Sequence, residues 1–165
     1  MTESMLVKLF EHNNWANAQM IQFCSALSDE QLDAEPQSVT KGSIRQTLIH
    51  LVSSQRGYLS LLTLPVEERQ RATLEFADLK EAVLASGEAL LKLVRDESGK
   101  LPHTRLQTTD GYYVEPWVVL VQIINHATEH REQINSMISA LGLTPPDLDG
   151  WGYGEFTNAL VPIPT

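Results

Sequence analysis

A chain of 165 residues, 42% of them hydrophobic and 20% charged, can bury a core and has the composition of an ordinary soluble domain. Its net charge of −9, without a cluster of Lys and Arg, argues against nucleic acid or an anionic membrane surface as a partner. Cys24 is the only cysteine, which excludes an intrachain disulfide and fits a reducing compartment. The start of the chain lacks the pattern of a signal peptide, and no apolar stretch approaches the ~20 residues of a spanning helix. We therefore expect one cytoplasmic domain over residues 1–165.

The first predicted helix runs from about Thr2 to Leu27, because apolar residues recur there at helical spacing. Asn13 and Asn17 fall on this apolar stripe, where leucine would be expected. Buried amides need hydrogen-bond partners, so these two either brace a polar site inside the fold or bond to neighbouring backbone and water. Cys24 lies on the same stripe without a histidine nearby in sequence, and we interpret it as a packing residue.

Two more helices follow. The second extends from its predicted N-cap, Ser43, to about Leu62, and it places His50 in an apolar setting. The third extends from about Phe76 to Asp96. It carries no histidine and no convincing catalytic group, so we expect it to be a structural wall.

After the third helix, the spacing of the apolar residues changes from helical to that of two short strands, Thr104–Thr108 and Tyr112–Val114. Asp110-Gly111 between them is a strong signal for a hairpin turn. His103, at the start of this hairpin, is predicted to be a surface histidine rather than a ligand.

Pro116 opens a fourth predicted helix that extends to Leu141, and Gly142 is its expected C-terminal stop. Its apolar stripe includes His130 and has His126 at the edge. The tail that follows is rich in proline, glycine and aromatic residues. We expect the tail to pack across the helices or against a partner subunit.

His126 and His130 are four residues apart, just over one helical turn, so both rings project from the same face. One helix supplies two ligands to one metal ion at that spacing. An antiparallel neighbour can bring His50 opposite the pair, and three neutral imidazoles with one open position are the ligand set of a catalytic zinc-type site. Nickel or iron accepts the same ligands. The alternative is that each histidine is a hydrogen-bonded core residue, but unpaired imidazoles are costly to bury.

The segment His126-x-x-Glu129-His130 also matches a short zinc-protease pattern in which the glutamate is the general base. Such a pattern arises easily by chance, and the chain lacks the size of those proteases. Glu129 points about 80° away from the bisector of the two histidines. It is a candidate base, and the competing interpretation is a solvated residue. The candidate site-lining groups are Asn13, Asn17 and Gln133.

Four segments, in order, resemble the DinB-like family, also called DinB/YfiT-like. They are Phe10–Asn17, similar to the family's aromatic-Asn-x-Trp-Ala-Asn pattern, Gly42–His50 and His126–Ile134, similar to its two histidine motifs, and Leu141–Asp149, similar to its ending. His12 replaces the aromatic residue of the first pattern, and Gln55 and Tyr58 stand where a Glu and a Trp are often found. These differences concern substrate specificity rather than the histidines.

The resemblance implies a four-helix bundle in up-down-down-up order, usually forming a homodimer. With the hairpin predicted above, the expected fold is all-α, with a short β-hairpin before the last helix. It implies a divalent metal ion, often zinc or nickel, held by His50, His126 and His130. Characterised relatives include thiol-dependent S-transferases and a mycothiol-dependent isomerase.

Two functions are therefore considered. In the first, the chain is a metal-dependent enzyme whose open coordination position takes water or a low-molecular-weight thiol and lowers its pKa for attack on a small electrophile. Family analogy favours thiol-dependent S-transfer over hydrolysis. In the second, the same histidines belong to a non-catalytic metal- or small-molecule-binding dimer.

Overall fold

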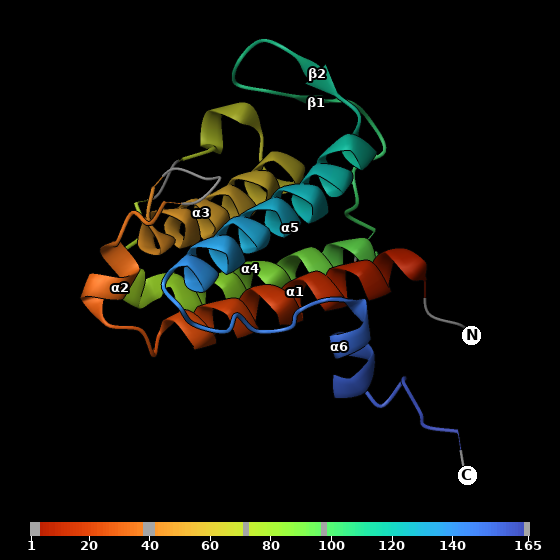
Figure 1. The fold of residues 1–165 in the computed structure, drawn as a ribbon. Helices are drawn as coiled ribbons and strands as arrows, with labels where there is room; N and C mark the ends of the chain where they lie inside the picture. Colours follow the sequence, from red (N-terminus) through yellow and green to blue (C-terminus); the bar gives the residue numbers. More distant parts are fainter. Residues whose placement is uncertain (1–3, 38–41, 71–72, 97–98, 164–165) are drawn as a thin grey trace.

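The computed structural model describes residues 4–37, 42–70, 73–96 and 99–163. Its centre is a four-helix bundle of α1 (Met5–Cys24), α3 (Ile44–Thr63), α4 (Leu79–Val94) and α5 (Pro116–Ala140) (Figure 1). α3 and α4 run in one direction, and α1 and α5 run in the other. The up-down-down-up order expected from the sequence is confirmed. Because α3 and α4 are parallel, the connection between them runs back along the bundle.

Side-chain caps explain where the early helices begin. The hydroxyl of Ser43 accepts a hydrogen bond from the backbone N–H of Gln46, so α3 starts directly after its predicted N-cap. Ser28 and Gln31 form a reciprocal capping box at the start of the short helix α2 (Asp29–Asp33).

The ends of α5 also follow from the sequence. Pro116 occupies the first turn, where its missing N–H removes no helical hydrogen bond. Gly142 has φ +78°, a left-handed conformation that glycine adopts without strain and that terminates the helix. The last helical residue is Ala140, one before the predicted end.

Two other predicted boundaries differ. α1 ends at Cys24 rather than Leu27, and its predicted start at Thr2 lies outside the described residues. The third predicted helix begins with a 3₁₀ turn, Phe76–Asp78, before α4. Helix ends commonly shift by this amount, because the terminal backbone groups have fewer hydrogen bonds to hold them.

Apolar side chains form two clusters in the bundle, one toward each end of the four helices. Representative members are Met20, Leu48, Leu51, Ile134 and Ile138 in one cluster, and Phe10, Leu62, Leu90, Leu93 and Ile123 in the other. Cys24 is buried in the first cluster, where burial raises the pKa of its thiol to about 12, so its packing role is confirmed. Polar side chains separate the two clusters at the middle of the bundle.

This polar layer is centred on Arg131, which is 4% exposed. Its guanidinium donates to the side-chain oxygens of Asn13 (3.0 Å) and Asn17 (2.6 Å). The amide of Asn17 donates to Gln55, whose own amide donates to Ser86 Oγ at 2.8 Å. Burial lowers the pKa of Arg131 to about 10, partly offset by attraction to Glu132. The hydrogen bonds link all four bundle helices at one level.

The predicted hairpin is present as β1 (Leu106–Gln107) and β2 (Tyr113–Val114), paired antiparallel. Both strands are shorter than predicted. Gly111 has φ +95°, as the turn requires. None of the helices in the described ranges is long and apolar enough to cross a bilayer.

A sixth helix, α6 (Gly150–Phe156), was not predicted, because three of its seven residues are glycines of low helix propensity. The side chain of Asp149 caps it, and Tyr153 and Phe156 pack on Trp15 of α1 with ring centroids 5.3 and 5.6 Å apart. Packing and capping therefore override propensity here. The expectation that the tail packs across the helices holds for α6, while the residues after it extend away from the bundle (Figure 1).

α1 and α4 approach closely at Gly87. A Cβ added to Gly87 would lie 2.9 Å from the side chain of Asn14, which donates to the carbonyl of Gly87. A Cβ on Gly57 of α3 would meet nothing within 4 Å. We expect Gly57→Ala to stabilise the protein by about 0.5–1 kcal/mol through helix propensity. The free energy of unfolding of Gly87→Ala should be about 1–2 kcal/mol lower than that of Gly57→Ala, because Asn14 must move and lose its hydrogen bond. Urea unfolding of both variants checks this, and equal effects would contradict it.

Candidate metal centre

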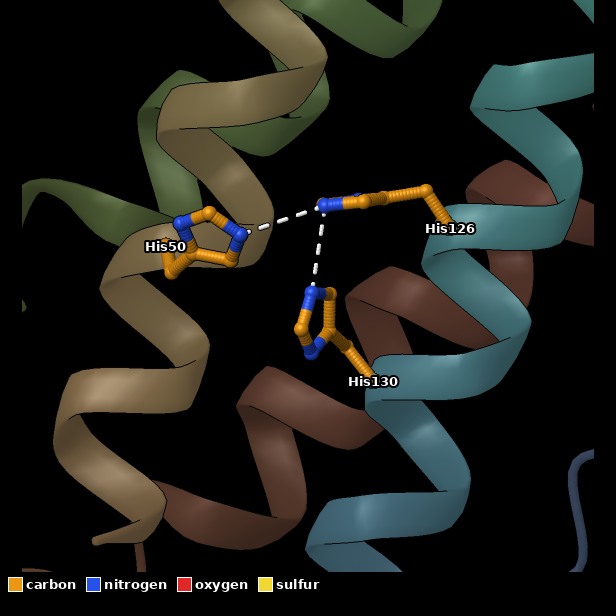
Figure 2. Close-up of side chains that lie close together, drawn as sticks. All are labelled: His50, His126 and His130. Carbon is orange, nitrogen blue, oxygen red and sulfur yellow. Dashed lines mark hydrogen bonds between the residues drawn. The ribbon is translucent and has the colours of Figure 1, made fainter. Parts of the chain in front are cut away.

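Three histidines from two helices point toward one another at the middle of the bundle. His50 extends from α3, and His126 and His130 extend from successive turns of α5 (Figure 2). The antiparallel packing of α3 against α5 therefore brings together residues that are 76 positions apart in the chain. His50 is exposed, and the other two are partly buried, so the cluster is open to solvent on one side.

The distances between the ring nitrogens suit one ion. His126 Nε2 lies 3.2 Å from His50 Nε2 and 3.1 Å from His130 Nε2. One ligand nitrogen from each histidine lies within 4.8 Å of the others. Two nitrogens bound to the same tetrahedral Zn²⁺ are about 3.3 Å apart, since each Zn–N bond is about 2.0–2.1 Å. The three side chains can therefore hold a metal ion after small rotations.

Gln133 sets the tautomer of one histidine. Its Oε1 lies 2.6 Å from His130 Nδ1. Because an amide oxygen only accepts hydrogen bonds, Nδ1 carries the proton and the lone pair is left on Nε2, the atom that faces His126. Hydrogen bonds of this kind orient histidine ligands in metal sites. Gln133, predicted to line the site, thus contacts it from behind His130.

Burial and mutual repulsion lower the pKa of two of the three histidines, His126 and His50. Burial lowers the pKa of His126 to about 4, and repulsion by His130 and His50 acts in the same direction. Burial, then repulsion by His130, also lowers the pKa of His50. An imidazole must be unprotonated to bind a metal, so these two side chains need not release protons before an ion binds near neutral pH.

These pKa shifts predict a pH-dependent stability of the metal-free protein. In the unfolded chain a histidine binds a proton below about pH 6.5, whereas folded His126 resists protonation down to about pH 4. The unfolded state therefore holds more protons between these values, and stability falls as pH falls through that window. Urea unfolding in EDTA at several pH values should show a shallower dependence for His126→Ala than for the unchanged protein. If stability fell equally steeply with pH in the variant and in the unchanged protein, the expectation would be wrong.

The other predicted site residues, Asn13, Asn17 and Glu129, make no hydrogen bond to the histidines in the part of the chain that the structure describes. Asn13 and Asn17 hydrogen-bond to Arg131 and Gln55 in the polar layer, and none of the hydrogen bonds among the described residues joins them to a histidine. They bond to side chains, rather than to the backbone or water that the sequence suggested as alternatives. Glu129 is exposed on α5 and likewise has no hydrogen bond to the histidines within the described part of the chain.

Two neighbours of the cluster were not anticipated. The ring of Tyr58 stands edge-on to that of His126, with centroids 5.7 Å apart. Gln122 Nε2 donates to the Tyr58 hydroxyl at 3.4 Å. The available signal was helical spacing, because Gln122 precedes His126 by four residues and Tyr58 follows His50 by eight. Arg131 was also missed, since a charged residue on an apolar stripe normally extends to solvent.

The model of the DinB family matches residues 1–161. The chain belongs to the DinB family. This confirms the resemblance carried by the four sequence segments. A curated relative of this DinB-family chain is protein DinB of Bacillus subtilis (strain 168), which is 25% identical over 161 residues, covering 90% of this chain and 91% of the relative.

Solved structures of DinB-like proteins share the fold. A DinB-like protein from Bacillus cereus ATCC 10987 superimposes with a TM-score of 0.64 at 18% identity, covering 86% of this chain and 94% of that one. A candidate member of the family from Exiguobacterium sibiricum 255-15 superimposes with a TM-score of 0.66 at 14% identity, covering 88% and 99% of the two chains. At these identities the comparison shows a common fold.

Proposed function

We propose that this DinB-family chain is a divalent-metal-dependent enzyme in which His50, His126 and His130 hold one ion, with zinc and nickel the favoured metals. The observation that carries the proposal is that His50 Nε2 and His130 Nε2 lie 3.2 and 3.1 Å from His126 Nε2, close to the spacing of two ligands on one ion. Three protein ligands with a solvent-open side match a catalytic site, whereas a structural zinc site is closed by four.

We further propose that the reaction is a thiol-dependent S-transfer to a small electrophile, or a related hydrolysis. A divalent ion at these histidines would polarise a bound water or thiol and lower its pKa. Burial lowers the pKa of His126 and His50, which favours their metal-binding neutral form, and Gln133 aims the lone pair of His130 inward. The exposed side of His50 leaves room for a substrate. Glu129 is a candidate base in this scheme, although its exposure gives it no specific support.

The test has two parts. Metal content of the purified protein, and Zn²⁺ and Ni²⁺ affinities from competition with a chromophoric chelator, establish whether the histidines bind an ion. The loaded protein is then assayed with low-molecular-weight thiols against a panel of electrophiles, and with ester substrates without thiol. Turnover that His126→Ala abolishes supports the enzyme. Tight metal binding without turnover across the panel would favour the non-catalytic metal-binding alternative.

We also propose that the protein is a homodimer. α6 and the segment after it expose apolar side chains, and association would remove these from water: Trp151 (72% exposed), Phe156 (63%), Val161 (73%) and Ile163 (89%). Sedimentation velocity is expected to give a mass of twice 18.4 kDa, and a monomer at micromolar concentration would contradict this.

A further inference from the structure

The Tyr58 hydroxyl is held beside the histidines with its proton uncommitted. Gln122 donates to the hydroxyl oxygen at 3.4 Å, so the hydroxyl acts as the acceptor in that contact. No acceptor for its own proton is found among the described residues. The rings of Tyr58 and His126 are nearly perpendicular, with centroids 5.7 Å apart, so the tyrosine packs directly against one member of the cluster. The contact is exposed to solvent, so the hydroxyl proton is available to an acceptor on a ligand that displaces water.

An open depression starts at His50, which is the one histidine of the cluster in its lining, and runs along α3 toward α4 and the hairpin. Its lining includes Ser54, Gly57 and Tyr58 on that helix, and Thr108 and Asp110 of the hairpin. With a volume of about 1510 Å³ it is larger than the roughly 300–1,000 Å³ of most small-molecule sites, and part of it extends beneath the α3–α4 connection. A Cβ on Gly57 would meet no atom within 4 Å, so the surface above this residue is free.

We propose that this side of α3 is the substrate-binding surface of the histidine site. The Tyr58 hydroxyl donates a hydrogen bond to an oxygen or nitrogen acceptor at the reactive end of the ligand, beside the histidines. The remainder of the ligand lies over Gly57. The hydroxyl of Ser54 suits a polar ligand that extends beyond its reactive group. This inference rests on the metal centre of the proposed function.

Cobalt(II), which takes zinc sites and has a visible spectrum, gives a readout that does not depend on activity. Azide is the probe for the reactive end, because it is a small anion with nitrogen acceptors. We expect Tyr58→Phe to retain Co²⁺ affinity and melting temperature, and to weaken azide binding by about 10- to 100-fold, as expected for loss of a hydrogen bond to a charged group. Tyr113→Phe, on an exposed hairpin tyrosine, is the matched control and should not change azide binding.

The surface above Gly57 is tested with two thiols of different size. Binding of each thiol to the Co²⁺-loaded protein is measured from the thiolate–cobalt absorption. We expect the unchanged protein to bind glutathione at least as tightly as 2-mercaptoethanol. Gly57→Leu should weaken glutathione binding by about 10-fold or more and leave 2-mercaptoethanol binding within about 2-fold, because only the larger ligand extends over residue 57.

The outcomes separate the two proposals. Failure of the unchanged protein to bind Co²⁺ would overturn the proposed function and this inference with it. Tight Co²⁺ binding with azide affinity unaltered in Tyr58→Phe, or with both thiols affected equally in Gly57→Leu, would overturn the inference alone.

Discussion

Replacing His126 with alanine is expected to lower the affinity of the protein for Zn²⁺ and Ni²⁺ by at least about 100-fold. The nitrogen of His126 lies within 3.2 Å of both His50 and His130, so it is the ligand that links the other two. Without it, one histidine ligand remains on each helix, and the metal ion would need water molecules to complete its coordination shell. Competition with a chromophoric chelator measures the change.

His103→Ala is the matched control for this experiment, because His103 is exposed before the hairpin and the substitution is chemically identical. Its metal affinity should equal that of the unchanged protein. If His126→Ala kept full affinity, the ion would be bound elsewhere in the chain. If both variants lost affinity equally, the effect would not come from the three-histidine cluster.

The second large effect is expected at Asn17, with Asn17→Ala destabilising the protein by about 2–4 kcal/mol. Asn17 accepts from Arg131 and donates to Gln55, and its side chain is 1% exposed. Its removal leaves a buried guanidinium with one fewer acceptor, and an amide oxygen without its donor. Both groups are too deeply buried to recover these hydrogen bonds from bulk water.

Urea unfolding measures the loss at Asn17, with Asn125→Ala as the control. Asn125 lies on the exposed side of α5, so the same substitution there should change stability by less than about 0.5 kcal/mol. A loss at Asn17 no greater than at Asn125 would mean that the polar layer contributes nothing to stability. Both values require a cooperative unfolding transition. We expect both variants to keep one, because the two apolar clusters, one on either side of the polar layer, are unchanged.

The polar layer shows where prediction from sequence reached its limit. The periodic positions of Asn13 and Asn17 indicated that both are buried, and the structure confirms this. Their partners were not identified, because hydrogen-bond partners in different helices depend on how those helices rotate against one another. Arg131 lies between apolar residues in the sequence, but only the facing asparagines of α1 explain how its charge is buried.

Local patterns were enough for most of the fold. Ser43, Pro116 and Gly142 mark helix ends because each satisfies or avoids a local backbone requirement, and all three act as predicted. α6 was missed because its glycines lower helix propensity and its stability comes from Trp15, more than 130 residues earlier in the chain.

What the sequence by itself determined was the four helices of the bundle, the hairpin and the pairing of His126 with His130 on one helical face. These depend on neighbours within a few residues, where backbone geometry alone sets the spacing. Only the tertiary structure decided that His50 meets the pair, that Tyr58 and Gln122 stand beside it, and that Asn13 and Asn17 bond to Arg131. Those contacts depend on the packing of whole helices, which the burial of two apolar clusters determines collectively.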